Sequence, residues 1–171
     1  MISWFKIDGL RTENKKVYLS WEQFDEMVKQ FSNKICSLPD PDKLCLLGVA
    51  RGGLPLLTAV SHQTGIRNIS IVQTQITNTD TPFDYGNIRL LIDGIRDEFD
   101  KFIVLEDIIG TGETLKFLLR YLQKKGKSIS SIFSLVIDED FLNSSEIDAP
   151  IYGGVKLPSK NWVVFPWERS I

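Results

Sequence analysis

Residues 101–115, KFIVLEDIIGTGETL, carry the pattern from which we predict the fold. The first half is a short, continuous apolar run with β-branched residues, which is typical of a strand buried on both faces of a parallel sheet. Two acids, Glu106 and Asp107, follow this run directly. A turn of glycine and threonine comes next, and from Leu115 onward the apolar residues recur at helical spacing. The predicted order is therefore strand, acidic pair, turn and helix.

The turn between this strand and this helix has the composition of a phosphate-binding site. Its residues are Gly110, Thr111, Gly112, Glu113 and Thr114. A helix N-terminus presents unpaired N–H groups and the positive end of the helix dipole, and glycines let the backbone approach a ligand closely. Carboxylates just upstream would accept hydrogen bonds from sugar hydroxyls or hold Mg²⁺. A phosphate beside a diol describes a ribose 5-phosphate.

This segment also has other interpretations. The acids could simply cap the following helix, and the glycines could form an ordinary turn. The segment lacks both the lysine of a P-loop and the glycine spacing of a dinucleotide-binding fold, so a nucleoside triphosphatase or a dehydrogenase is disfavoured.

Residues 106–114, EDIIGTGET, resemble the phosphoribosyl pyrophosphate (PRPP) binding motif of the type I phosphoribosyltransferases, and other matches resemble the xanthine-guanine branch of that family. The resemblance implies an α/β fold: a mostly parallel central sheet flanked by helices, a flexible active-site loop and a small C-terminal base-binding segment. It implies transfer of the phosphoribosyl group of PRPP to a purine such as xanthine, guanine or hypoxanthine, with release of pyrophosphate. Mg²⁺ as cofactor and a homo-oligomer, dimer or tetramer, are further implications.

The resemblance also assigns roles within the motif. Glu106 and Asp107 would hold the ribose hydroxyls and the metal ion and would act as catalytic residues together with Arg51, while residues 110–114 would bind the 5-phosphate. Gly110 departs from the 6-oxopurine pattern, in which an acid usually occupies this position and is thought to assist proton transfer at N7 of the base.

A second strand-to-helix turn suits a second anionic group. Residues 44–49 predict a buried strand and residues 54–64 a helix. The turn between them is Ala50, Arg51, Gly52 and Gly53. Its arginine can place a fixed charge and its glycines can expose N–H groups to a pyrophosphate, although alone it could equally be a tight turn with a surface arginine. It resembles the family's pyrophosphate loop, which implies a cis peptide bond between Ala50 and Arg51.

A polar stretch follows the next predicted strand, residues 69–74. Residues 75–86 have too few apolar side chains to pack tightly, and by position they resemble the family's flexible loop. Such a loop would shield the reaction from water. Arg89, just after it, aligns with a basic residue that reaches the pyrophosphate.

The C-terminal third carries the residues expected to contact the base. Residues 129–137 predict a buried strand that runs into three acids, and no lysine lies in residues 128–150, where the 6-oxopurine branch carries one. Acids at this position suit a base edge that donates hydrogen bonds, such as an amino group. Residues 152–168 resemble the end of the xanthine-guanine enzymes. Ile137, Trp162 and Val163 are therefore the expected base-binding residues, unless the tryptophan only closes the core.

The N-terminal part predicts an amphipathic helix over residues 20–37. Ser20 and Gln23 have the spacing of a capping box, and aromatic residues follow at helical spacing. Residues 1–16 could form a short strand or arm, with no function evident from the sequence.

Composition excludes several classes of function. The 171 residues suit a single domain over residues 1–171, and 43% hydrophobic and 25% charged residues are ordinary for a globular protein. A net charge of -2 without a basic cluster argues against nucleic acid as a partner. One histidine is too few for a zinc site, and no nucleophile is paired with it.

The cellular setting follows from cysteine usage and hydropathy. Cys36 and Cys45 lack CxxC spacing, which favours two free thiols, and no apolar run is long enough to cross a membrane. We therefore expect a cytoplasmic protein without a membrane partner. The remaining alternatives are a PRPP-binding regulator without turnover and a transferase for a non-purine or amino-bearing base.

Overall fold

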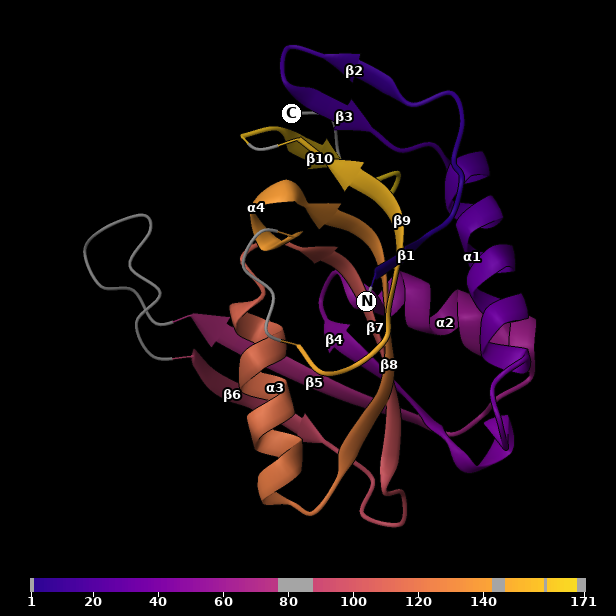
Figure 1. Cartoon of the computed structure of the whole chain (residues 1–171), viewed down its shortest axis with the longest axis vertical. Helices are drawn as coiled ribbons and strands as arrows, with labels where there is room; N and C mark the ends of the chain where they lie inside the picture. Colours follow the sequence, from indigo (N-terminus) through magenta and orange to yellow (C-terminus); the bar gives the residue numbers. More distant parts are fainter. Residues whose placement is uncertain (1, 77–87, 143–146, 159, 169–171) are drawn as a thin grey trace.

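The computed structural model describes residues 2–76, 88–142, 147–158 and 160–168. The strands are β1 (Ile2–Trp4), β2 (Arg11–Glu13), β3 (Lys16–Tyr18), β4 (Cys45–Ala50), β5 (Ile69–Ile76), β6 (Ile88–Gly94), β7 (Lys101–Ile109), β8 (Ser128–Asp138), β9 (Ile151–Leu157) and β10 (Trp162–Val164). The helices are α1 (Trp21–Cys36), α2 (Gly53–Thr64), α3 (Glu113–Lys124) and α4 (Glu139–Leu142), with a 3₁₀ turn, η1 (Pro41–Lys43). Over these ranges the order of elements is that of an α/β protein (Figure 1).

A seven-stranded sheet forms the centre, in the order β1-β9-β8-β7-β4-β5-β6. Its neighbouring strands are parallel except for β5 and β6, which are antiparallel. The mostly parallel sheet predicted from the sequence is thereby confirmed. β4 and β7 are direct neighbours, with Gly48 opposite Leu105. Because parallel strands end at the same edge of a sheet, the turns that follow β4 and β7 emerge side by side.

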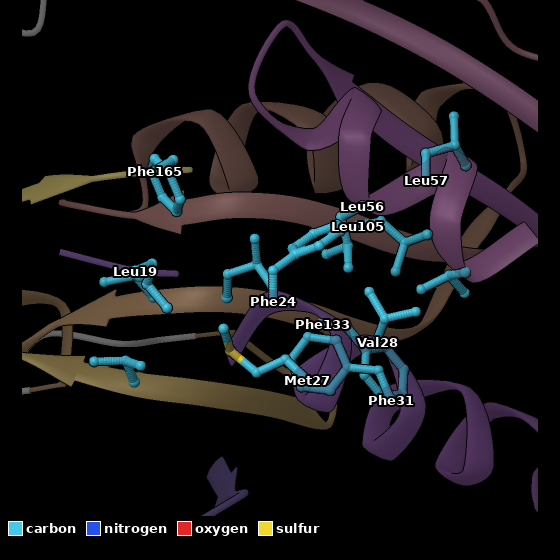
Figure 2. Packing of buried hydrophobic residues seen from close by; sticks show 14 of the residues in the cluster. Leu19, Phe24, Met27, Val28, Phe31, Leu56, Leu57, Leu105, Phe133 and Phe165 are labelled. Carbon is cyan, nitrogen blue, oxygen red and sulfur yellow. The ribbon is translucent and has the colours of Figure 1, made fainter. Parts of the chain in front are cut away.

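Helices cover both faces of the sheet (Figure 1). α1 and α2 pack on one face, where Met27 and Phe31 of α1 meet Phe133 of β8 (Figure 2). The rings of Phe31 and Phe133 are 5.3 Å apart and tilted by 59°. α3 covers the opposite face with Leu115, Leu118 and Leu122, which belong to a second buried cluster. Each helix therefore buries one apolar stripe against the sheet, as helical spacing predicts.

The start of α1 confirms the predicted capping box. The backbone N–H of Gln23 donates to Oγ of Ser20 over 3.2 Å, and the N–H of Ser20 donates to Oε1 of Gln23 over 2.9 Å. These two bonds satisfy backbone donors that the first turn of a helix leaves without intrahelical partners. The boundaries of α1 are accordingly within one residue of the predicted ones.

A three-stranded sheet in the order β10-β3-β2 joins segments from the two ends of the described chain. β10 pairs with β3 in parallel, with Val163 opposite Val17, and both side chains are buried in the core. β1 adds to the central sheet by pairing with β9. Residues 1–16, for which the sequence indicated no function, thus extend the central sheet through β1 and pair through β2 with β3, the strand that supports β10.

Two predicted boundaries differ from the structure. β7 continues to Ile109, so that Glu106 and Asp107 lie inside the strand, because β8 pairs alongside it as far as Ile137. β5 extends to Ile76 and takes in the first two residues of the expected flexible loop. Most of that loop, residues 77–87, lies outside the described residues. None of the helices among the described residues is both long and apolar enough to cross a membrane.

Replacing Phe31 by alanine should lower the free energy of unfolding by about 3–5 kcal/mol, because the ring is fully buried between α1 and the sheet. Urea denaturation would measure this loss. Lys29→Ala on the exposed side of the same helix should change the free energy by less than about 0.5 kcal/mol. Equal losses in the two variants would contradict this account of the core.

Candidate active site

The two turns that follow β4 and β7 touch each other through glycine. A methyl group added to Gly52 would lie 1.7 Å from Oδ2 of Asp107, and one added to Gly53 would lie 2.5 Å from the carbonyl oxygen of Leu105. The backbone of residues 50–53 therefore rests directly on the acidic end of β7. The peptide bond between Ala50 and Arg51 is cis, as the family resemblance implies.

The acidic pair at this contact is held by the backbone around it. Oδ1 of Asp107 accepts the N–H of Ile108 over 2.9 Å, and Oε1 of Glu106 accepts the N–H of Asp107 over 3.3 Å. Glu106 is only 8% exposed, and burial raises the pKa of its carboxyl well above the ordinary value, with Asp107 raising it further. Two adjacent carboxyl groups in a partly desolvated place favour a bound cation, which would offset their charge.

Beyond the acids, residues 110–114 enclose a hollow of about 180 Å³, which Glu106, Ile108, Ile109 and Leu115 also line. Gly112 precedes α3 with a positive φ of 80°, and no side chain caps the helix there. The N–H groups of the first turn are thus available to an anion. Glu113 forms an ion pair with Lys116, Oε1 to Nζ 3.0 Å, which balances its negative charge beside the hollow.

A second hollow, of about 540 Å³, adjoins the first. Its lining is Asp107, Ile108, Gly110, Thr111, Asp138, Asp140, Leu157, Asn161, Trp162, Val163, Phe165 and Glu168. Trp162 is 66% exposed, so that a large part of its ring is available for stacking. The lining that the structure describes holds four carboxylates and no lysine, arginine or histidine. When ionised, the charged groups of this lining can therefore only accept hydrogen bonds.

Not every predicted residue lies at these hollows. Ile137, a predicted base-binding residue, has a fully buried side chain that lines neither hollow, whereas its neighbour Asp138 lines the larger one. Arg51 and Arg89 are exposed, and neither belongs to the lining. Arg89 lies on β6, where its guanidinium donates to Oε1 of Gln75 over 2.7 and 3.2 Å.

The structure adds residues that sequence reasoning did not assign to the site. Asn161 and Phe165 flank β10 in the lining of the larger hollow. Oε2 of Glu168 accepts the N–H of Phe165 over 3.0 Å and so fixes the turn after β10. In the sequence, the spacing of Trp162, Trp167 and Glu168 could have indicated this turn. Trp167 packs on Phe165, with ring centroids 4.9 Å apart.

Residues 18–170 match the family described as the phosphoribosyl transferase domain. The chain belongs to this family. The hypoxanthine/guanine phosphoribosyltransferase of Methanohalophilus mahii is 33% identical over 117 residues, 65% of this chain and 60% of that protein. The xanthine-guanine phosphoribosyltransferase of Idiomarina loihiensis is 22% identical over 159 residues, 92% of this chain and 90% of the relative.

A solved structure agrees with these relatives. The purine phosphoribosyltransferase from Pyrococcus horikoshii has a TM-score of 0.71 and 26% sequence identity, covering 92% of this chain and 96% of that chain. The matches confirm the predicted type I phosphoribosyltransferase fold and the purine branch of the family.

Gly52→Ala tests the contact between the two turns. The added methyl group must displace the carboxylate of Asp107, so we expect the free energy of unfolding to fall by about 1–3 kcal/mol. Gly110→Ala is the matched control, because its methyl group would meet no atom within 4 Å and its φ is not positive. Urea denaturation of both variants checks the prediction, and a Gly52→Ala protein as stable as the Gly110→Ala protein would refute it.

Proposed function

We propose that this protein is an Mg²⁺-dependent phosphoribosyltransferase that joins a purine base to PRPP and releases pyrophosphate in nucleotide salvage. The observation that carries the proposal is the meeting of two glycine-containing turns and a hollow of about 540 Å³ at one acidic pair, Glu106 and Asp107. Each part of the substrate has a matching part of this site, and the family relationship supports the same activity.

PRPP would bind along the C-terminal edge of β4 and β7. Residues 110–114 would take the 5-phosphate with backbone N–H groups and threonine hydroxyls. Glu106 and Asp107 would accept hydrogen bonds from the ribose hydroxyls, since carboxylates are acceptors for such donors. Residues 50–53 would take the pyrophosphate, with Arg51 supplying a positive charge and Arg89 a second one from β6.

The acidic pair also fits Mg²⁺. Among the described residues no group of three or more histidine, cysteine, aspartate or glutamate side chains could hold a metal ion. Mg²⁺ is commonly held by one or two carboxylates, with water and substrate phosphates completing its shell. Asp107 and Glu106 would therefore hold the ion together with PRPP. Bound there, Mg²⁺ would stabilise the charge on the departing pyrophosphate.

The chain's own contribution to the reaction is orientation and charge. The bond from C1 of the ribose to the pyrophosphate oxygen breaks as a ring nitrogen of the base bonds to C1, and no protein nucleophile is required. Trp162 would stack on the base and hold that nitrogen toward C1. The base also loses a proton. Since Gly110 has no side chain to accept it, Asp107 and Asp138, which line the hollow, are the acceptors that we propose.

The hydrogen-bond acceptors that line the larger hollow affect which purine should bind most tightly. Guanine presents N–H and amino donors on one edge, which match a further carboxylate of the lining such as that of Asp140. Xanthine carries a carbonyl oxygen in place of the amino group, so that a hydrogen-bond acceptor would face the carboxylate. Hypoxanthine lacks the amino group altogether. Among these purines we therefore propose guanine as the preferred acceptor.

Three further features belong to the proposal. Residues 1–171 would act as one unit, because β1 pairs with β9 and β3 pairs with β10. The working form would be a homo-oligomer, dimer or tetramer, as the family resemblance implies. The two cysteines are free thiols, which suits the cytoplasm.

Removing the acidic pair should abolish turnover while the fold survives. We expect Glu106→Gln combined with Asp107→Asn to lower pyrophosphate release by at least about 100-fold, because both hydroxyl and metal ligands are lost. The control is Asp25→Asn with Glu26→Gln, an exposed pair on α1 with the same change in charge. Circular dichroism would verify folding, and full activity of the site variant would refute the proposed site.

A base panel tests the reaction and its specificity. Pyrophosphate release from PRPP and Mg²⁺ would be followed with guanine, hypoxanthine, xanthine and adenine, with and without EDTA. We expect guanine to give the highest kcat/KM, by about tenfold over xanthine, and EDTA to stop the reaction. PRPP binding without release on any base would contradict the enzyme assignment, whereas a preference for xanthine would contradict only the role of the acceptor lining.

A further inference from the structure

Phe141 lies beneath the phosphate-binding turn without belonging to the lining of either hollow. It is the third residue of α4, the short helix that follows β8, and its side chain is fully buried. A methyl group added to Gly112 would lie 2.4 Å from Cε2 and 2.6 Å from Cδ2 of Phe141. The ring therefore packs directly against the backbone of the turn, in the space that any side chain at position 112 would need.

The same short segment reaches the larger hollow. Asp138 and Asp140, on either side of the start of α4, both line that hollow. Oδ1 of Asp138 accepts the N–H of Asp140 over 2.8 Å, which fixes how the chain turns from β8 into α4. Over residues 138–141 the chain thus contacts the larger hollow with its carboxylates and the phosphate turn with its aromatic ring.

We propose that Phe141 is a positioning residue, which sets the phosphate-binding turn at a fixed distance from the base hollow. The inference rests on the proposed function, in which these two places hold the 5-phosphate and the base. C1 of the ribose lies between them, so that the spacing of the two anchors determines how closely C1 approaches the base nitrogen. Displacements of a fraction of an ångström in such an arrangement have large effects on rate.

The physical basis is the rigidity of the contact. A phenylalanine ring has few rotatable bonds and fills its space fully, whereas a leucine in its place leaves part of the volume empty. The phosphate-binding turn, residues 110–114, could then shift into the volume that the leucine leaves empty. Gly112 has no side chain that could prevent this, and no side chain caps α3 at this position.

The decisive comparison is between two buried phenylalanines. Phe141→Leu and Phe133→Leu each shorten a fully buried ring, but Phe133 packs on Phe31 and Tyr152, away from the turn. We expect similar losses of Tm in both. Only Phe141→Leu should raise the KM for PRPP, by about fivefold or more, and lower kcat, while Phe133→Leu stays within about twofold of the wild type. Equal kinetic effects in the two variants would overturn the proposal.

A second variant approaches the contact from the other side. Gly112→Ala alone should weaken PRPP binding strongly, since its methyl group meets the ring and an alanine is strained at the positive φ of this position; only the first of these two causes depends on Phe141. In the double variant Gly112→Ala/Phe141→Leu the shorter side chain makes room, so we expect the double variant to bind PRPP more tightly than Gly112→Ala alone. Additive losses would show that the two residues act independently and would refute the direct contact.

Calorimetric Kd values for PRPP keep this test separate from the proposed function. If wild-type protein binds PRPP but transfers it to none of the purines, the enzyme assignment fails, yet Phe141→Leu should still weaken binding by the same factor. If wild-type protein transfers the phosphoribosyl group normally and Phe141→Leu does so with unchanged KM and Kd, only the role of Phe141 fails.

Discussion

The contact between the backbone of Gly52 and the carboxylate of Asp107 is the constraint on which the site depends. β4 and β7 are adjacent parallel strands, so their following turns leave the sheet at the same edge. Only the absence of a side chain at position 52 lets the first turn settle onto the acid of the second. This contact brings the turn proposed for the pyrophosphate, the carboxylates proposed for ribose and metal, and the phosphate turn into one continuous surface. Without it the same motifs would be separate loops.

The carboxyl groups at this junction are unusual in their surroundings. Glu106 is almost fully buried beside a second acid, and no basic side chain belongs to the lining of either hollow among the described residues. Burial makes the charged form of Glu106 costly, which is why the pKa of its carboxyl is raised. A site that concentrates acid in this way has no favourable charge of its own for an anionic substrate. Arg51 and Arg89 at its margins, together with a divalent ion bound to the substrate, would supply the positive charge that an anionic substrate needs.

Local patterns in the sequence predicted the parts of this site, and tertiary packing decided how they meet. The apolar run, the acids and the turn at residues 101–115 follow short-range rules, so their order could be derived. The same is true of the Ser20 capping box. The contact of Gly52 with Asp107 could not be derived in this way, because it depends on β4 lying next to β7. The contact of Phe141 with Gly112 could not be predicted either, because an aromatic residue near a strand end is equally consistent with ordinary core packing.

The placement of Ile137 shows a different limit. The apolar run that ends at Ile137 predicted the end of β8 to within one residue. Which side chain there faces the larger hollow depends on where β8 ends and α4 begins, because neighbouring residues of a strand point to opposite faces. Residues 1–16 were uninformative for a similar reason. Their strands are too short to show a period, and they are stabilised by partners, β9 and β10, from the other end of the chain.

The pairing of β3 with β10 also affects how the protein acquires its activity during synthesis. Residues 16–18 leave the ribosome long before residues 162–164, which complete the wall of the larger hollow. The edge of β3 that pairs with β10 must therefore stay unpaired until residues 162–164 are made, and contacts of such long sequence separation form slowly. The phosphate turn, built from neighbouring residues, can form much earlier. A nascent chain would thus pass through a stage with its anion-binding turns in place and no wall against which a base could stack.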